Sequence, residues 1–517
     1  MTDPSALIAT AGRATVGSLF RDRVASHPGR AAVQDGDKVL TYAQLNDRVN
    51  RTAATIAAQG LKPGERVALL AENCAEYLEI KLACAKLGVI LACQNWRLAP
   101  AEVQHCLDLV EPTLVIVSPR HSSLLGQIDT HGLPVLSLGD DWEAALAKAS
   151  NAEPGVEVDP EAGLVILYTS GTTGLPKGAV ISHRAEVARA MLMHVDLPIT
   201  PGDTCVAWPP LYHMGASDIS LATLMTGGKV VVLDGFDLDA MLHLIEHERL
   251  AWLVLMPGMI DRLIEGIKAR DIKPRYVGAC GAMADLVPTH QLAEITSLLD
   301  APFINTFGST ETGTPPCTTS LIPPGTIPDS LAKMRSNFVE LRLLDEDGND
   351  VPDGEPGEIA LRGPTMFSGY WRNPEANAKD FRDGWFHMGD VFVRLPDGRY
   401  QFVDRAKYMI KSGGENIYPA EIERILLAHE QVADAAVVRR ADDRWGEVPV
   451  AFIARKDKAL AEDELYAACR QALAGFKQPK AIHFIAAETF PRSVTGKVQR
   501  HEMEAWLTSG KVPGEDR

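Results

Sequence analysis

Apolar and polar residues alternate before about residue 400 in a pattern that predicts helices interleaved with buried strands. Residues 41–60 carry apolar side chains three and four positions apart, which predicts an amphipathic helix that Gly60 closes. Short continuous apolar runs predict strands that helices cover on both faces of a sheet. These runs are RVALLAEN (66–73), VILAC (89–93), LVILY (164–168), TCVAW (204–208), KVVVL (229–233), AWLVL (251–255) and FINTF (303–307).

After about residue 400 the pattern changes to that of a small mixed domain. A glycine-rich turn leads into a helix that Pro419 can begin. Strand-like runs at 434–440, 448–455 and 481–487 surround a helical pattern at 462–475, and a helical tail follows. We therefore predict an α/β fold. It consists of a large N-terminal domain of helix-covered sheets, residues 1–404, and a small, mobile α+β C-terminal domain, residues 405–517.

Length, composition and charge narrow the class of protein. A chain of 517 residues is too long for one hydrophobic core, and 46% hydrophobic with 23% charged residues is typical of a globular enzyme. The net charge of −17 repels phosphate backbones and anionic membranes, so we expect no nucleic-acid partner. No apolar stretch approaches the roughly 20 residues of a membrane span. The eight cysteines form no CxxC pair, which favours buried thiols and a cytoplasmic location.

The string YTSGTTGLPKG at 168–178 is the strongest local signal. Its glycines let the backbone approach a ligand closely, and successive N–H groups in such a turn bind anions such as the β- and γ-phosphates of ATP. The spacing is not that of a Walker A loop, and a strand rather than a helix follows it. As a bare pattern the string also fits an ordinary loop. The candidate phosphate-binding residues are Thr169, Ser170, Gly171, Thr172, Thr173, Gly174 and Lys177.

Further motifs follow this loop in a characteristic order. They are PPLYHMG (209–215), GACGAMA (278–284), NTFGSTETG (305–313), GYWRNPE (369–375), GWFHMGD (384–390), FVDRAKYMIKSGGENIYPAEIE (402–423) and PRSVTGK (491–497). Together they make the chain resemble the AMP-forming acyl-CoA synthetases. That family belongs to the wider adenylate-forming group, which includes luciferases and peptide-synthetase adenylation domains. The resemblance runs along almost the whole chain.

The resemblance implies how the nucleotide base and α-phosphate are bound. Phe307 stands where the family stacks an aromatic ring on adenine, and it keeps the ring but lacks the hydroxyl of the more usual tyrosine. Asn305 would meet the purine edge, with Gly308 beside the nucleotide. Thr310 would contact the α-phosphate.

The resemblance also implies a metal site and a ribose site. Glu311, together with Thr173, would bind the Mg²⁺ ion that spreads the charge of the triphosphate. Asp390 would accept hydrogen bonds from the ribose hydroxyls, and Arg405 would be its cationic companion. Met388 replaces a threonine that is usual in the family, which removes a hydroxyl near the ribose carboxylate.

Three residues are implied to act in the reaction itself. Lys497 would bring its ammonium to the acyl carboxylate and the α-phosphate and so stabilise the developing charge. His213 would orient the carboxylate at the mouth of the acyl pocket. Lys407 matches the hinge about which the small domain turns between the two half-reactions.

The small domain would also contribute to binding coenzyme A. The resemblance implies a tunnel for pantetheine lined by small residues, and a surface for the nucleotide of CoA that includes basic residues such as Lys480 and Arg97. Gln478 stands where some relatives have an arginine, which puts one phosphate contact in doubt. The implied CoA-binding residues of this domain are Ser412, Gly413, Gly414 and Trp445.

The acyl pocket is the least specified part of the site. Small residues at Gly215 and Gly281 favour a roomy slot, and no arginine stands beside them in the sequence to bind a second carboxylate. Asp218 could meet a polar substituent or cap the following helix, and we favour the cap. The candidate pocket residues are Trp208, Met214, Gly215, Gly281, Met283 and Thr312.

These observations predict a carboxylic acid–CoA ligase that forms an acyl-adenylate from ATP and then an acyl-CoA thioester. The expected substrate is a monocarboxylic acid with an apolar body (medium-chain, aryl, phenylpropenoid or alicyclic), and the cofactors are ATP, Mg²⁺ and coenzyme A. One alternative is a stand-alone adenylation enzyme that loads a carrier-protein thiol. Another is a binding protein with a degenerate site, which would be expected to lack Lys497, Glu311 or Asp390. A homodimer is an open alternative to a monomer.

Overall fold

The computed structural model describes residues 13–169, 175–256, 258–413, 415–492 and 498–514. By its internal contacts the chain divides into two compact units. The first unit comprises Met1–Glu340 and Arg362–Gly384, and the second comprises Leu341–Leu361 and Trp385–Arg517. The predicted boundary between residues 404 and 405 lies inside the second of these units, and as a division between domains it stays a prediction.

Six strands form one sheet of the first unit, in the order β6-β5-β3-β4-β7-β8. Neighbouring strands are parallel except β7 and β8, which pair antiparallel. The central strands are buried almost throughout, as their apolar runs predict. The bounds are β3 Arg66–Leu70, β4 Ile90–Cys93, β5 Leu114–Val117, β6 Val135–Ser137, β7 Gly163–Thr169 and β8 Lys177–Ser182.

A second sheet of this unit has eight strands in the order β16-β13-β12-β11-β9-β10-β1-β2. Its inner neighbours are parallel, and the two edge pairs, β13 with β16 and β1 with β2, are antiparallel. The bounds are β1 Ala31–Asp35, β2 Lys38–Thr41, β9 Thr204–Ala207, β10 Lys229–Val232, β11 Arg249–Leu253, β12 Tyr276–Cys280, β13 Phe303–Ile304 and β16 Leu321–Ile322. A short hairpin pairs β14 (Phe307–Ser309) with β15 (Gly313–Cys317), and β19 is Phe381–Arg382.

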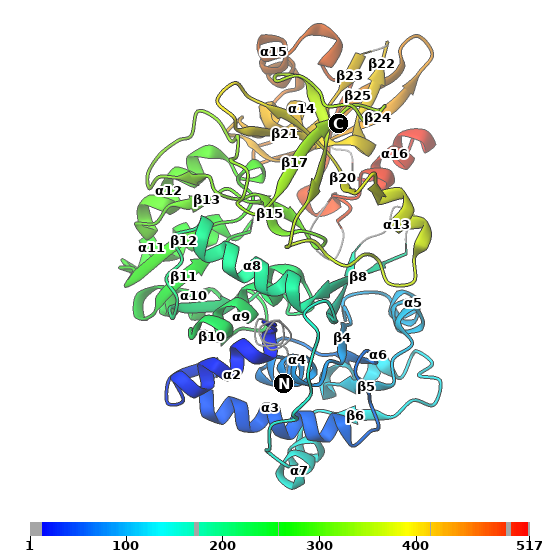
Figure 1. Ribbon diagram of the computed structural model, residues 1–517. Coiled ribbons are helices and arrows are strands. Elements are labelled where there is room, and N and C mark those ends of the chain that lie inside the picture. Colours follow the sequence, from blue (N-terminus) through cyan, green and yellow to red (C-terminus); the bar gives the residue numbers. More distant parts are fainter. Residues whose placement is uncertain (1–12, 170–174, 257, 414, 493–497, 515–517) are drawn as a thin grey trace. The chain divides into compact units, whose positions relative to one another are not determined.

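Helices connect and cover these strands (Figure 1). The predicted amphipathic helix is confirmed as α3, whose cap residue Thr41 and third residue Gln44 bond reciprocally through side chain and backbone. The bounds are α2 Val16–Ser26, α3 Tyr42–Ala57, α4 Ala75–Leu87, α5 Pro100–Val110, α6 Ser122–Leu125, α7 Asp140–Lys148, α8 His183–Asp196, α9 Met214–Thr226, α10 Leu238–His247, α11 Ile260–Arg270, α12 Thr289–Leu299 and α13 Pro374–Asp380. Within the described residues no helix is long and apolar enough to cross a membrane.

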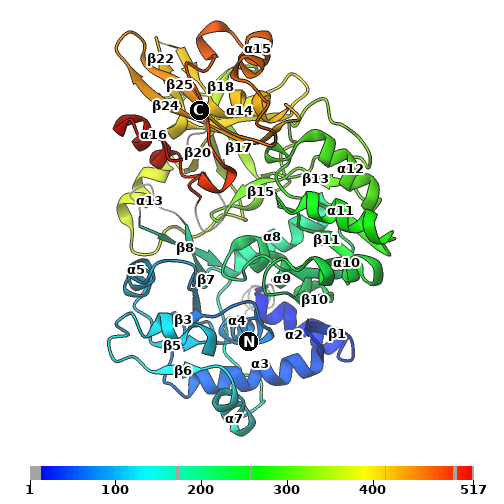
Figure 2. The ribbon, with the colours of Figure 1, turned by 180° about the vertical axis from the view of Figure 1, so that it is seen from behind.

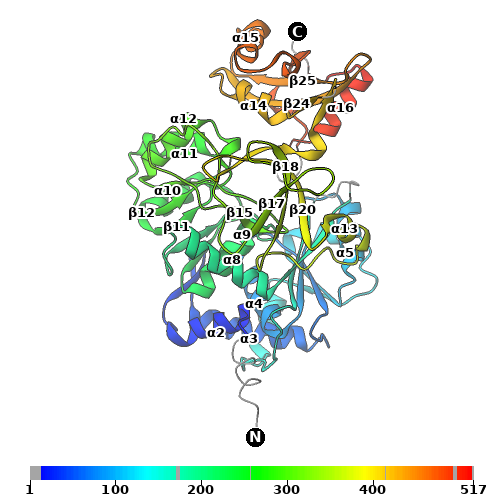
Figure 3. The same cartoon turned by 45° about the horizontal axis from the view of Figure 1, so that its top comes forward.

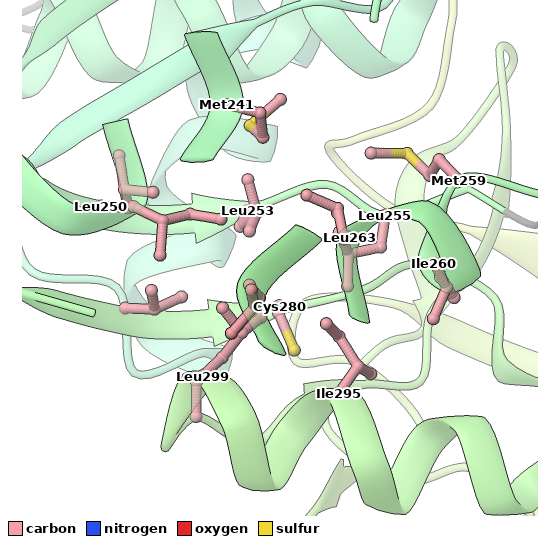
Figure 4. Close-up of a cluster of buried hydrophobic side chains, with 14 of the residues drawn as sticks. Met241, Leu250, Leu253, Leu255, Met259, Ile260, Leu263, Cys280, Ile295 and Leu299 are labelled. Atoms are coloured by element: carbon pink, nitrogen blue, oxygen red, sulfur yellow. The ribbon is translucent and has the colours of Figure 1, made fainter. Parts of the chain in front are cut away.

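A large apolar core lies between the second sheet and its helices (Figure 4). Met241 of α10, Leu253 of β11, Leu263 of α11, Cys280 of β12 and Ile295 of α12 are all buried in it. The strands that carry the site segments of this unit are thus fixed by close packing, because interiors of this kind tolerate few voids.

Strands β18 and β20 to β25 of the second unit pair antiparallel, β26 runs parallel to β25, and helices α14, α15 and α16 belong to the same unit (Figure 3). Pro419 begins α14, as its sequence predicts. Side chains of β24 and β25 alternate between two clusters, one packed with α14 and α15 and the other with α16. The bounds are β17 Glu340–Leu344, β18 Pro356–Arg362, β20 Trp385–Arg394, β21 Tyr400–Arg405, β22 Ile410–Ser412, β23 Glu415–Ile417, α14 Pro419–Leu427, β24 Val432–Asp442, β25 Gly446–Arg455, α15 Glu462–Ala472, β26 Ile482–Phe484 and α16 Arg500–Ser509.

Candidate active site

The predicted phosphate loop connects two antiparallel strands. Thr169, at the end of β7, is paired in register with Lys177, at the start of β8. Both ends of the loop are therefore fixed by the first sheet. Ser170, Gly171, Thr172, Thr173 and Gly174 lie outside the described residues, so their contacts with phosphate stay predictions.

Tyr370 joins the lysine of this loop to the predicted metal ligand. The Lys177 ammonium lies 3.8 Å from the centre of the Tyr370 ring and 3.3 Å from Asp380 Oδ2. The Tyr370 hydroxyl donates a hydrogen bond of 2.8 Å to Glu311 Oε1. Burial and the Glu311 carboxylate raise the pKa of Tyr370, so the phenol stays protonated and remains a donor. Tyr370 was not predicted as a site residue, although its place in the motif GYWRNPE is a usable sequence signal.

The carboxylate of Glu311 suits a magnesium site that ATP completes. The side chain is buried, and Tyr370 orients one of its oxygens. Mg²⁺ is usually held by one or two carboxylates together with phosphate oxygens and waters, rather than by a cage of protein ligands. The described part of the chain contains no group of three or more His, Cys, Asp or Glu that could hold a metal.

The predicted adenine-side residues lie at the hairpin of β14 and β15. Phe307 is buried, and Asn305 is 1% exposed. Asn305 Oδ1 accepts from the Ala284 amide at 3.2 Å, and its Nδ2 donates to the Leu331 carbonyl at 2.9 Å. The Asn305 amide therefore ties three segments together, and its contact with the purine stays a prediction.

Glycine is required in this hairpin for a packing reason. A Cβ on Gly308 would lie 2.0 Å from the Gly313 carbonyl oxygen, so no larger residue fits between the two strands. Thr310 is half-buried in the turn that follows. Thr312 is fully buried, and its hydroxyl accepts from the Ser309 amide at 3.0 Å and donates to the Pro315 carbonyl at 2.5 Å. The Thr312 hydroxyl thus makes hydrogen bonds within its own turn and the strand that follows.

The predicted ribose residues lie side by side in the second unit. Asp390 in β20 and Arg405 in β21 are paired in register, and Arg405 Nε lies 3.0 Å from Asp390 Oδ1. The Asp390 side chain is 2% exposed, whereas that of Arg405 is 39% exposed. A buried carboxylate beside an accessible cation is an arrangement that can bind a polyhydroxyl ligand, and the ribose role stays a prediction.

The residues predicted at the mouth of the acyl pocket begin α9. His213 is the N-cap of this helix, and its Nδ1 accepts from the Gly215 amide at 3.2 Å. In the neutral ring the proton is then on Nε2. Met214 and Gly215 form the first turn. Trp208 follows β9 and donates from its indole nitrogen to the Val254 carbonyl at 3.0 Å.

The two glycines predicted to widen the pocket have different surroundings. A Cβ on Gly215 would meet only His213 Nδ1 at 3.6 Å, which leaves space beside it. Gly281 has a φ of +96°, and a Cβ there would lie 2.4 Å from the ring of Phe303. The expectation that Gly281 indicates a roomy slot is therefore wrong, because Phe303 fills that space. Met283, two residues further on, is half-buried.

Asp218 does not cap a helix. It lies inside α9, is 3% exposed, and pairs with Arg189 of α8 at 3.1 Å between Nη1 and Oδ2. The cap position is taken by His213, because the helix begins five residues earlier than the aspartate would require. Sequence reasoning missed Arg189, since nothing near it in the sequence indicates a buried charge.

Two of the predicted CoA-binding residues of the second unit, Gly413 and Trp445, lie against each other. Gly413 has a φ of +59°, and a Cβ there would lie 2.8 Å from the Trp445 ring. The Gly413 amide donates to the Trp445 carbonyl at 2.7 Å, so the glycine makes room for the indole, which is 43% exposed. Ser412 is buried in β22, and Gly414 lies outside the described residues.

The structure describes the predicted hinge lysine but not the predicted catalytic lysine. Lys407 is exposed in the turn after Arg405, and its ammonium lies 4.8 Å from the centre of the Tyr408 ring. Lys497 lies outside the described residues. Both roles stay predictions.

Two models of known protein families match the chain. The model for AMP-binding enzymes matches residues 20–371, and the model for the C-terminal domain of AMP-binding enzymes matches residues 421–497. The chain therefore belongs to the AMP-forming acyl-CoA synthetases of the adenylate-forming superfamily.

Individual relatives agree with this membership. The chain is 34% identical over 501 residues to a feruloyl-CoA synthase of Amycolatopsis sp., covering 94% of this chain and 98% of that protein. It is 33% identical over 490 residues to an indoleacetate–CoA ligase of Aromatoleum aromaticum, covering 92% and 95%. The solved structure of o-succinylbenzoate coenzyme A synthetase from Bacillus subtilis, in complex with ATP and magnesium ion, matches with a TM-score of 0.82. It is 26% identical and covers 94% of this chain and 98% of that chain.

The activity of the class follows from this membership. The enzyme is an AMP-forming acid–CoA ligase that uses ATP, Mg²⁺ and coenzyme A. A carboxylate is joined to AMP with release of pyrophosphate, and the acyl group then passes from the acyl-adenylate to the CoA thiol with release of AMP.

Proposed function

We propose that the substrate is a monocarboxylic acid with an apolar body, and that aryl and phenylpropenoid acids are used best. The named activities of the feruloyl-CoA synthase and the indoleacetate–CoA ligase support an aryl acid, because each of those names specifies an aromatic acyl group. Medium-chain and alicyclic acids are weaker members of the same proposed class.

The observation that carries this proposal is the pairing of Arg189 with Asp218. A second carboxylate on the substrate would need an uncompensated cation in the pocket. Arg189 is the buried cation of α8, and its charge is already met by Asp218 at 3.1 Å. The candidate pocket residues Trp208, Met214 and Met283 are apolar. A dicarboxylic acid would therefore lose the hydration of its second charge without gaining a charged partner from Arg189 or from these three side chains.

The site residues are proposed to divide the chemistry as follows. The acid carboxylate is already ionised, so its attack on the α-phosphorus needs positioning and neutralisation of charge rather than a base. Lys497, Lys177 and the ion held by Glu311 would neutralise the phosphates. His213 would donate from Nε2 to the carboxylate, and Asp390 with Arg405 would hold the ribose. Rotation about Lys407 would then bring the second unit into position for the attack by CoA.

A panel of acids tests the substrate proposal directly. We would measure ATP–pyrophosphate exchange with benzoate, ferulate, octanoate, cyclohexanecarboxylate and adipate, and repeat each assay with CoA for thioester yield. We expect the highest kcat/KM with benzoate or ferulate and no exchange above background with adipate. Exchange with adipate equal to that with ferulate would overturn the proposal.

The same thioester assay distinguishes CoA from a carrier protein as the acceptor of the acyl group. Replacing CoA by a phosphopantetheine-bearing carrier protein should give at least 100-fold less thioester if the carrier-protein alternative is wrong (about 100-fold being the loss for a misplaced reactant). We also propose a cytoplasmic location, where ATP and CoA are both supplied. The homodimer is checked by light scattering after gel filtration.

A further inference from the structure

Four charged side chains are buried between α4, α8 and α9 and have no assigned role in the reaction. Lys81, Glu186, Arg189 and Asp218 are each at most 3% exposed. Helices α8 and α9 lie side by side in both views of the first unit (Figures 1 and 2). Burying charge is costly unless each group is paired and hydrogen-bonded, so the contacts of this cluster indicate what it does.

Arg189 reaches two backbone segments in addition to Asp218. Its Nη2 donates to the Thr310 carbonyl at 3.1 Å, and its Nε donates to the Thr365 carbonyl at 3.0 Å. A Cβ on Gly313 would lie 2.7 Å from Arg189 Cδ, so this glycine leaves the space through which the arginine passes. The planar guanidinium thus donates one hydrogen bond to the turn that carries Thr310 and Glu311, while Asp218 and the Thr365 carbonyl hold the guanidinium in place.

Lys81 holds the other site segment of this unit. Its ammonium donates to Ser217 Oγ at 2.8 Å and to the Leu211 carbonyl at 3.3 Å. Leu211 precedes His213 in the motif PPLYHMG. The cluster therefore contacts both the turn of Thr310 and the segment that leads to His213.

Asp218 and Glu186 are the two carboxyl groups of the cluster. Neither oxygen of Glu186 nor Oδ1 of Asp218 has a hydrogen-bond partner within the described ranges. Burial, and then the neighbouring Asp218, raise the pKa of Glu186 to about 8, while Arg189 and Lys81 lower it. The raised pKa favours the protonated, neutral form of Glu186 at neutral pH.

We propose that Arg189, held by Asp218, is a positioning residue for adenylation, because it fixes the backbone from which Thr310 and Glu311 project. The proposal rests on the roles proposed above for Thr310 and Glu311. The buried pair would then serve the reaction as well as stability. If the turn were displaced, Thr310 would be misplaced from the α-phosphate and Glu311 from the metal ion in the first half-reaction.

The decisive variant is Arg189→Lys in the full chain, which keeps the charge but removes the fork that reaches two carbonyls. We would measure ATP–pyrophosphate exchange, thioester formation from supplied acyl-adenylate, and the midpoint of thermal unfolding. A misplacement of about 1 Å costs about 100-fold in rate. We therefore expect kcat for exchange to fall about 100-fold, while the thioester rate stays within about threefold of the unmodified enzyme.

Arg48→Lys is the matched control. Arg48 Nε pairs with the fully buried Glu79 at 2.5 Å, but this pair joins α3 to α4 and has no hydrogen bond to Thr310 or Thr365. We expect this variant to lower the unfolding midpoint and to leave both rates unchanged. An Arg189→Lys enzyme that loses both half-reactions equally, or neither, would overturn the positioning role.

Asp218→Asn decides the matter if Arg189→Lys does not fold. It keeps the shape of the side chain and leaves Arg189 in place without its charge partner. A fall in exchange about tenfold greater than the fall in thioester formation supports the proposal, and equal falls overturn it. Each rate is divided by that of the unmodified enzyme with the same acid. A wrong choice of acid therefore shows itself in the unmodified enzyme and is not mistaken for failure of the positioning role.

Discussion

Each unit of the enzyme contains an arginine–aspartate pair of nearly equal length, and the two pairs differ in burial. Arg189 and Asp218 are 3.1 Å apart with exposed fractions of 1% and 4%, and Arg405 and Asp390 are 3.0 Å apart with exposed fractions of 39% and 2%. Desolvation makes a buried pair costly to break, whereas an accessible cation is screened by water and contributes little to stability. The first pair is therefore suited to holding the protein together around its site, and the second to exchanging water for a ligand.

Removal of one partner from the buried pair should have the largest effect on stability. Asp218→Ala leaves the guanidinium of Arg189 buried without its charge partner, which typically costs about 3–5 kcal/mol. We expect urea unfolding, followed by tryptophan fluorescence, to show a loss of that size. A loss below about 1 kcal/mol would mean that Glu186 ionises and takes over the role of Asp218.

The double variant Arg189→Met with Asp218→Leu separates stability from positioning. Replacing a buried ion pair by apolar residues of similar volume is often neutral or stabilising. We expect this variant to recover most of the stability lost in Asp218→Ala while ATP–pyrophosphate exchange stays low. If both the stability and the exchange rate recovered, the pair would have a structural role only and no positioning role.

Glu186 should make the stability of the buried cluster depend on pH. Its pKa is raised from 4.5 to about 8 by burial and Asp218, with Arg189 and Lys81 opposing. Between these values the unfolded chain has released the proton and the folded chain has kept it, so stability falls as the pH rises, by up to about 1.4 kcal/mol per pH unit. The contribution is fully present below pH 4.5 and is lost by about pH 8.

Glu186→Gln should remove this slope, because the amide stays neutral at every pH measured. The slope is measured from the free energy of unfolding at pH 6, 7 and 8. The control is Glu161→Gln at the surface, where the side chain is 63% exposed. We expect the control to keep the slope of the unmodified enzyme. Parallel curves for Glu186→Gln and the unmodified enzyme would contradict a protonated Glu186.

Local pattern predicted the elements of the fold but not the contacts that make the site. Periodicity and capping located α3, and the apolar runs located the buried strands, because both signals lie within one element. The contact of Arg189 with Thr310 spans 121 positions, and that of Tyr370 with Glu311 spans 59. Such contacts depend on how sheets and helices pack, so no short pattern contains them.

The errors in the prediction have the same origin. Asp218 has the chemistry of a helix cap, but the helix starts at Met214, and this places the aspartate in the interior. Gly281 has the size of a pocket glycine, but Phe303 occupies the space beside it. In both cases the residue type was interpreted correctly and its neighbours could not be seen from the sequence.

The accessible pair should show the smallest effect on stability and a clear effect on the nucleotide. Arg405→Gln removes a cation that is 39% exposed, so we expect the free energy of unfolding to change by no more than about 1 kcal/mol. If the pair binds ribose, KM for ATP should rise about tenfold, since a hydrogen bond to a charged group contributes roughly 1.5–3 kcal/mol. Steady-state kinetics with ATP as the varied substrate measure this rise in KM.

Arg394→Gln is the matched control. Arg394 also lies in the second unit, is 49% exposed and pairs with Asp353 at 3.4 Å, so its loss should leave KM for ATP unchanged. A large loss of stability in Arg405→Gln with an unchanged KM would reverse the assignment of the two pairs, because the exposed arginine would then be the structural one.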